Sequence, residues 1–77
     1  MNNIKDKLVN LLSVHFKVPI SDVPNIEFGK TAEWDSMNHL KMILEIEKNF
    51  NLKVEENSYS EIINFISIYN YIQSKLK

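Results

Sequence analysis

The chain has 77 residues, of which 44% are apolar and 25% charged, with a net charge of -1 and no cysteine. This length and composition predict one globular domain spanning residues 1–77. The absence of cysteine excludes disulfides and thiolate metal sites, and two isolated histidines, His15 and His39, do not make a metal cluster. A domain this small has little room for a deep catalytic cleft, so an autonomous enzyme is disfavoured.

The charged residues are unevenly distributed. Residues 21–61 hold nine acidic residues and four lysines, whereas the two flanks together hold five lysines and one acid. This pattern favours a partner with a basic surface, and without arginine or a basic stripe it argues against nucleic acid. No stretch approaches the roughly 20 consecutive apolar residues of a membrane span, and the amino terminus is amphipathic rather than a signal peptide. We therefore expect a cytoplasmic protein, and a monomer.

The first 35 residues predict one helix and a long loop. The apolar residues of the helix recur at helical spacing over residues 3–17, and the helix ends before Pro19; they are Ile4, Leu8, Leu11, Leu12 and Phe16. Residues 18–35 contain both prolines and the only glycine. We interpret them as an ordered loop that Ile26 and Phe28 hold against the core.

The remaining chain predicts further helices. A broad apolar stripe marks a second helix over residues 36–50, which either Asp35 or Ser36 could cap; the stripe is Met37, Leu40, Ile43, Leu44, Ile46 and Phe50. Residues 55–63 predict one or two helical turns ending at Ile62 and Ile63, and Asn64 caps a last helix of apolar positions up to Leu76. The expected fold is all-α. It is a small four-helix bundle, three main helices plus one short helix, with a long loop between the first and second helices.

Ser36 stands out because it lies where the long loop meets the strongest predicted helix, within the sequence Trp34-Asp35-Ser36-Met37. A phosphate esterified to this hydroxyl would lie against the free amides of a helix amino terminus, where negative charge is favoured. The alternative is that Ser36 only caps the helix.

Residues 35–72 resemble the acyl carrier protein family in the order of their features. These are a D-S-[LM] motif halfway along the chain, an amphipathic second helix with Glu47 and Phe50 near its end, a Leu52-Val54 exit, an acidic short helix ending at Ile62, and Tyr71-Ile72 in an apolar last helix. The resemblance implies a free-standing carrier that is not itself an enzyme. A phosphopantetheinyl transferase would move 4′-phosphopantetheine from coenzyme A to Ser36, beside Asp35 and Met37, and the arm would carry acyl or aminoacyl groups as thioesters.

The resemblance also implies a surface that partner enzymes contact. Its acids would be Asp35, Glu45 and Glu47, which otherwise are ordinary solvated residues. Trp34 either contacts a partner or the arm, or anchors the loop to the bundle. His39, one helical turn after Ser36, either approaches the arm's phosphate or a partner, or is a partly exposed residue without a special role.

A cleft between the second and third helices could shelter an acyl chain, as is common in this family. Its candidate residues also fit an ordinary core; they are Met37, Leu40, Ile43, Leu44, Ile46, Ile62 and Ile63. Lys41 and Lys48 interrupt the acidic face of the second helix, and Lys53 follows it. They favour a specialised pathway over general fatty acid synthesis, with an acyl- or aminoacyl-activating ligase and a downstream transferase or synthase as partners.

Two other classes of function stay open at this point. One is an unmodified interaction module in which Trp34, Met37 and Leu40 anchor a partner on the second helix. The other is a small hydrolase using Ser36 with His39, which lacks any nameable third catalytic group or oxyanion site.

Overall fold

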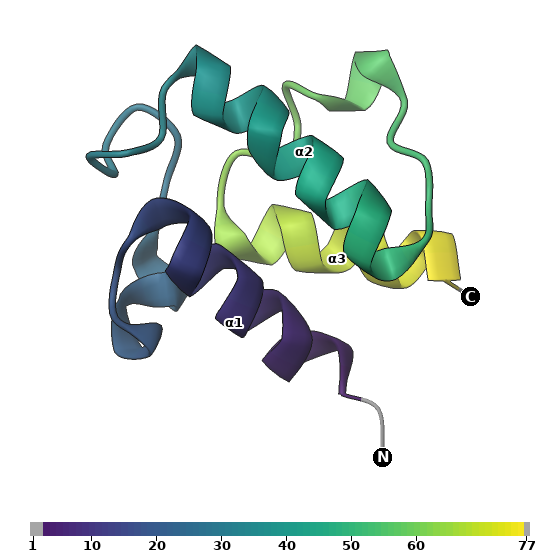
Figure 1. Ribbon diagram of the computed structural model, residues 1–77. Helices are drawn as coiled ribbons and strands as arrows, with labels where there is room; N and C mark the ends of the chain where they lie inside the picture. The colour runs from purple at the N-terminus through teal and green to yellow at the C-terminus, as the bar shows by residue number, and fades with distance from the viewer. Residues whose placement is uncertain (1–2, 77) are drawn as a thin grey trace.

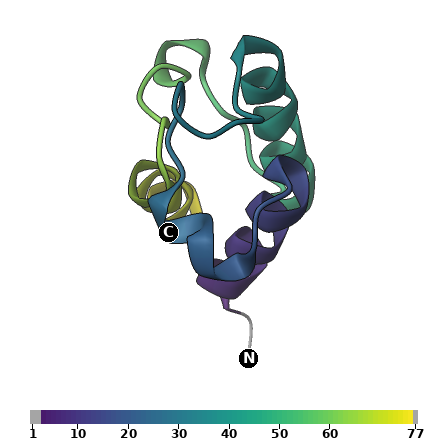
Figure 2. The same ribbon diagram turned by 90° about the vertical axis from the view of Figure 1, so that its left-hand side faces the viewer.

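The computed structural model describes residues 3–76. Its three α-helices are α1 (Ile4–Phe16), α2 (Ser36–Phe50) and α3 (Phe65–Leu76), and two short 3₁₀-helices are η1 (Ile20–Asn25) and η2 (Glu56–Ser58). Figures 1 and 2 show α1 and α2 in one layer with α3 crossing behind them. The all-α prediction, with three main helices and a short one before the last, is confirmed. No helix within residues 3–76 is long and apolar enough to cross a membrane.

Side-chain caps fix where the helices begin. Asn3 Oδ1 accepts a hydrogen bond from the Asp6 amide at the start of α1, and Asn64 Oδ1 accepts one from the Ser67 amide, 2.8 Å away, at the start of α3. α1 and α2 both end on a residue in the left-handed conformation, Lys17 and Asn51. The predicted boundaries of the three main helices agree with the structure to within one residue, because capping residues and Pro19 mark them in the sequence.

The loop between α1 and α2 is more ordered than its sequence predicts, because it contains η1. This helix begins after Pro19, contains Pro24 and places Val23 in the core. Of the two residues expected to hold the loop, Ile26 is buried, but Phe28 remains exposed at the edge of Trp34. The Phe28 amide donates to the Ile63 carbonyl at 2.9 Å, and Figure 2 shows the loop running beside the segment before α3.

The segment between α2 and α3 differs from its prediction. Its helical part is a single turn, η2, which ends at Ser58, so the expected helical turns up to Ile62 and Ile63 are wrong. Ile62 is nevertheless buried, because the chain after η2 turns back across the bundle towards α3. An apolar residue in an irregular segment can reach the core without helical geometry.

The core lies between the three α-helices, and among residues 3–76 its only buried polar side chains are one histidine and one serine at its margin. Its buried apolar residues come from every element except η2; they are Leu8, Leu12, Phe16, Val23, Ile26, Trp34, Met42, Ile43, Ile46, Phe50, Val54, Ile62, Phe65, Ile68 and Ile72. Apolar burial of this kind supplies most of the free energy that stabilises a small domain without disulfides.

Candidate functional site

Ser36 is the first residue of α2 and is exposed to solvent. It is not the cap of the helix. Asp35 is the N-cap, and its Oδ1 accepts a hydrogen bond from the Asn38 amide at 2.9 Å. The interpretation of Ser36 as only a helix cap is therefore wrong, because the neighbouring residue has that role.

The start of α2 can accept an anion on Ser36. The amides of the first turn of a helix have no carbonyl partner within the helix, and the helix dipole places partial positive charge there. α2 has 15 residues and provides such an end, in which the Asn38 amide already donates to Asp35 Oδ1. Met37, the other neighbour of Ser36, is also exposed. A phosphodiester on the Ser36 hydroxyl would thus combine access to solvent with favourable electrostatics.

Beneath this exposed start lies a buried hydrogen-bonded chain. The Trp34 side chain is 2% exposed and its Nε1–H donates to His39 Nδ1 at 2.9 Å. Because an indole nitrogen only donates, Nδ1 must accept, and the ring proton lies on Nε2, which is 2.7 Å from the Tyr59 carbonyl oxygen. His39 therefore joins the residue two positions before Ser36 to the segment after η2.

Aromatic packing completes this cluster. The Phe16 and Trp34 rings stack with their centroids 4.5 Å apart. The ring centroids of Phe28 and His39 are 5.2 Å apart. The prediction that Trp34 contacts a partner directly is therefore wrong, because its side chain is buried. His39 is 9% exposed, and its contact with a partner or with the arm stays a prediction. Trp34 anchors the loop to the bundle. His39 is also not the partly exposed residue of the alternative interpretation.

These contacts argue against the hydrolase and remove one of the three proposed anchors of the interaction module. Both ring nitrogens of His39 are engaged, so neither is available to take a proton from Ser36 as a hydrolase would require. The interaction module loses Trp34 as an anchor, because that side chain lies in the core. Met37 and Leu40 remain exposed on α2.

An open pocket of about 460 Å³ adjoins His39 on the side of η2. Its lining comes from the α1–α2 loop, the first turn of α2 and the segment before α3; the residues are Phe28, His39, Tyr59, Ser60 and Ile63. Only Ile63 belongs to the predicted acyl-chain cleft. The residues that sequence reasoning missed lie on irregular segments, where no periodic pattern indicates which side chains face one another.

The other predicted cleft residues do not line this pocket. Ile43, Ile46 and Ile62 are buried in the core, which agrees with the ordinary-core interpretation. Leu40 and Leu44 are exposed on the outer side of α2. The stripe at helical spacing therefore contains core residues and surface residues together.

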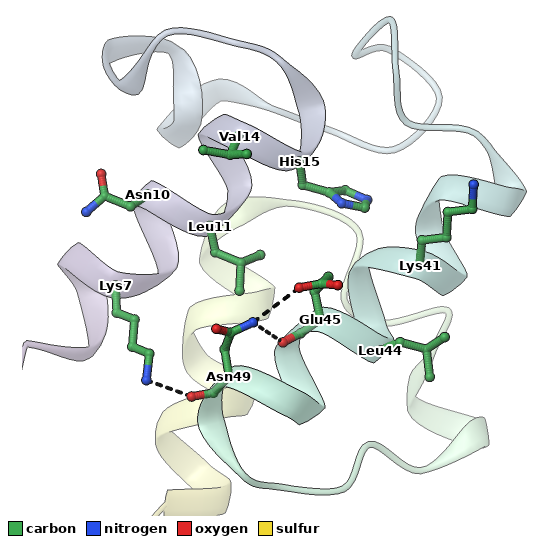
Figure 3. Close-up of a pocket in the computed structure, with 9 residues that line it drawn as sticks. All are labelled: Lys7, Asn10, Leu11, Val14, His15, Lys41, Leu44, Glu45 and Asn49. Atoms are coloured by element: carbon green, nitrogen blue, oxygen red, sulfur yellow. Dashed lines mark hydrogen bonds between the residues drawn. The ribbon is translucent and has the colours of Figure 1, made fainter.

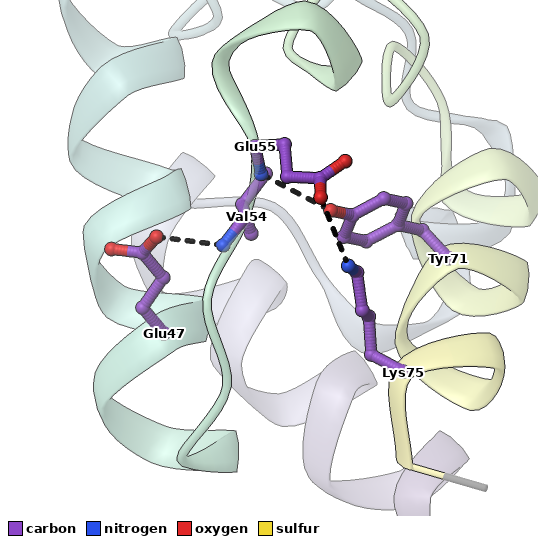
Figure 4. A network of polar contacts seen from close by, with 5 residues as sticks. All are labelled: Glu47, Val54, Glu55, Tyr71 and Lys75. Carbon is purple, nitrogen blue, oxygen red and sulfur yellow. Dashed lines mark hydrogen bonds and ion pairs between the residues drawn. The ribbon is translucent and has the colours of Figure 1, made fainter.

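The acids of α2 are held by the protein itself. Glu47 Oε2 accepts from the Val54 amide at 2.8 Å, and Glu45 Oε1 is 3.3 Å from the Asn49 side-chain nitrogen. Figure 4 shows Glu47 beside the connection to η2, where Glu55 in turn pairs with Lys75 of α3 at 3.8 Å. Both α2 glutamates are only half-exposed, so Asp35 is the more accessible of the three acids predicted to contact partners.

The comparisons with known proteins agree with this geometry. No family model matches the chain. An acyl carrier protein from the strain N1 of Cylindrotheca sp. is 30% identical over 78 residues, which cover 100% of this chain and 98% of that protein. An acyl carrier protein from Brachyspira hyodysenteriae is 27% identical, covering 100% of this chain and 96% of that protein. The chain therefore belongs to the acyl carrier protein family, whose members are carriers rather than enzymes.

Proposed function

We propose that Ser36 bears a 4′-phosphopantetheine arm on which the protein carries acyl or aminoacyl intermediates between enzymes. The observation that carries this proposal is the position of Ser36: an exposed hydroxyl at the start of a long helix whose cap is supplied by the adjacent Asp35. The D-S-M sequence around it is the part of the chain that resembles the attachment motif of the family.

The residues around Ser36 fit this group. The arm supplies a terminal thiol for the thioester, so the chain needs no cysteine of its own. The Ser36 oxygen would hold the phosphate, the first-turn amides of α2 would face it, and Asp35 would keep the helix start in place. Asp35 also offers a negative charge beside the hydroxyl that a basic transferase surface can contact.

A specialised set of partners is part of the proposal. Lys41 and Lys48 are exposed on α2, whereas Glu45 and Glu47 are half-buried. The helix therefore lacks the acidic outer face expected for general fatty acid synthesis. We favour an acyl- or aminoacyl-activating ligase and one downstream transferase or synthase as partners, in the cytoplasm.

The test is the intact mass of the protein before and after incubation with coenzyme A, Mg²⁺ and a broad-specificity phosphopantetheinyl transferase. The wild type gains the mass of one phosphopantetheine group. Ser36→Ala gains nothing, and its stability stays within about 0.5 kcal/mol of the wild type because alanine suits a helix and the cap remains. A folded wild-type protein that gains no mass, even with its native transferase, would contradict the proposal.

The partner set has a separate test. The modified protein is offered to a malonyl transferase of general fatty acid synthesis and, in parallel, to ligases that activate other acids or amino acids. Loading by one of the ligases and poor loading by the malonyl transferase is the expected result. Efficient loading by the malonyl transferase would contradict the specialised pathway, but it would leave the proposed carrier function intact.

A further inference from the structure

A groove runs between α1 and α2 on the side of the molecule shown in Figure 3. Its volume is about 650 Å³, and Leu11 forms its floor between the two helices. Val14 of α1 is 79% exposed and Leu44 of α2 is 62% exposed at its borders. Large apolar side chains that are this exposed on both sides of one groove indicate a surface that another molecule covers.

The groove is preformed, because hydrogen bonds join α1 to α2 near both of its ends. Lys7 Nζ donates to the Asn49 carbonyl oxygen at 2.6 Å, as Figure 3 shows. Two turns further along α1, His15 Nε2 is 3.1 Å from the Asn38 carbonyl oxygen. A binding partner would therefore not have to order these two helices.

The outer side of α2 that borders the groove is apolar and positively charged. Met37, Lys41, Leu44 and Lys48 follow one another at spacings of four, three and four residues, so they lie along one face of the helix. All four are exposed, and within residues 3–76 neither lysine forms an ion pair. The two glutamates of α2, by contrast, accept the hydrogen bonds described above.

We propose that this groove and the α2 face beside it bind an amphipathic helix of a partner protein, one that carries acidic side chains beside its apolar ones. Apolar positions spaced three and four apart would pack on Leu11, Val14 and Leu44, and a flanking carboxylate would pair with Lys41. This partner would carry negative charge, whereas the acid-rich middle of the sequence predicts a partner with a basic surface. One acid of that segment, Glu45, also lines the groove, where its Oε1 is held 3.3 Å from the Asn49 side-chain nitrogen. The two lysines of the lining, Lys7 and Lys41, outnumber it.

The occupant proposed here is a partner enzyme of the proposed carrier, and in this respect the inference rests on the proposed function. The contact itself does not involve Ser36, so the unmodified protein is expected to bind. The two proposals can therefore fail independently.

The probe is a pair of synthetic amphipathic peptides with leucines spaced three and four apart, flanked by glutamates in one peptide and by lysines in its twin. Their binding to the isotope-labelled protein is followed by the shifts of backbone amide resonances. The glutamate peptide is expected to bind about fivefold more tightly and to shift the resonances of Leu11, Val14, Lys41 and Leu44. Ser36→Ala should bind both peptides as the wild type does.

Two substitutions with matched controls locate the contact. Lys41→Glu and Val14→Asp should each weaken binding of the glutamate peptide about fivefold. Lys53→Glu alters an exposed lysine beyond α2, and Ile66→Asp alters an apolar residue of α3 that is 60% exposed. Both controls should leave binding unchanged to within about twofold.

Three results would overturn the proposal. The lysine peptide could bind as well as or better than its twin, or the shifted resonances could lie outside the groove. The groove resonances could instead shift with protein concentration in the absence of peptide, which would show that a second copy of this chain is the occupant.

Discussion

The two functional regions of α2, its start around Ser36 and its outer face around Lys41 and Leu44, differ in how their side chains are held. At its start, Ser36 is exposed above side chains that are buried and fully hydrogen-bonded, with Trp34 and His39 joined to the Tyr59 carbonyl. Along its outer face, Leu44 and Lys41 are exposed and have no fixed partner in residues 3–76. A site of covalent modification gains from a rigid support, whereas a docking surface must release its partner after each visit. Substitutions of the buried side chains beneath the start of α2, Trp34 and His39, should therefore change stability, and substitutions on its outer face should change binding.

The largest effect is expected for Trp34→Ala. Removing this buried ring leaves a cavity beside Phe16 and deprives His39 of its donor, so we expect the free energy of unfolding to fall by about 4 kcal/mol. Urea unfolding followed by circular dichroism measures it. Trp34→Phe keeps most of the packing and should lose less than half as much. Equal losses in the two variants would show that the hydrogen bond, not the ring, dominates.

His39→Leu is expected to destabilise the protein by about 2 kcal/mol. The Trp34 Nε1–H and the Tyr59 carbonyl would both lose their partner in a buried place. His15→Leu is the matched control, because that ring is less buried and is 3.1 Å from a single carbonyl oxygen; it should lose about 1 kcal/mol or less. Trp34 is the sole tryptophan, so its emission reports directly on the altered pair. Similar losses for both histidines would contradict the special position of His39.

The Asp35 side chain both caps α2 and carries a negative charge, and substitutions can separate these two roles. Asp35→Ala removes the acceptor for the Asn38 amide and should cost about 1 kcal/mol, whereas Asp35→Asn keeps an N-cap oxygen and should stay close to the wild type. If the carboxylate also attracts the transferase, Asp35→Asn slows modification of Ser36 without loss of stability. Thermal unfolding and the rate of mass gain give the two readouts. Equal stability of the alanine and asparagine variants would contradict the cap.

Leu44→Ala is expected to have the smallest effect on stability, below about 0.5 kcal/mol, because its side chain is mostly in solvent. The same substitution should weaken binding of the glutamate peptide. Chemical unfolding and peptide titration of one sample measure both effects. A large loss of stability would show that Leu44 belongs to the core, and the contrast between the two regions of α2 would then disappear.

Local signals explain why the helices could be predicted from the sequence. Asn3, Asp35 and Asn64 each accept an amide hydrogen bond from the residue three positions later, and such caps are visible in the sequence before any folding is considered. The position of Ser36 follows from the same signals. The short helix η1 was missed because a segment with Pro19 at its start and Pro24 inside it resembles a loop.

The burial of Trp34 and His39 could not be predicted, because their partners lie far away in the sequence. Phe16 comes from α1 and the Tyr59 carbonyl from an irregular segment, and a backbone carbonyl leaves no trace in the amino-acid sequence. The role of Glu47 depends in the same way on a backbone amide of the following connection. Residue type and spacing indicate that an acid is present, but not whether the protein itself uses it.

The most direct test of the central claim is to locate the modification. The wild-type protein is treated with coenzyme A and a phosphopantetheinyl transferase, digested, and sequenced by tandem mass spectrometry. The account predicts a single phosphopantetheine group on Ser36 and none on the other exposed serines, such as Ser21 and Ser60. A folded protein that remains unmodified, or that carries the group on another residue, would contradict it.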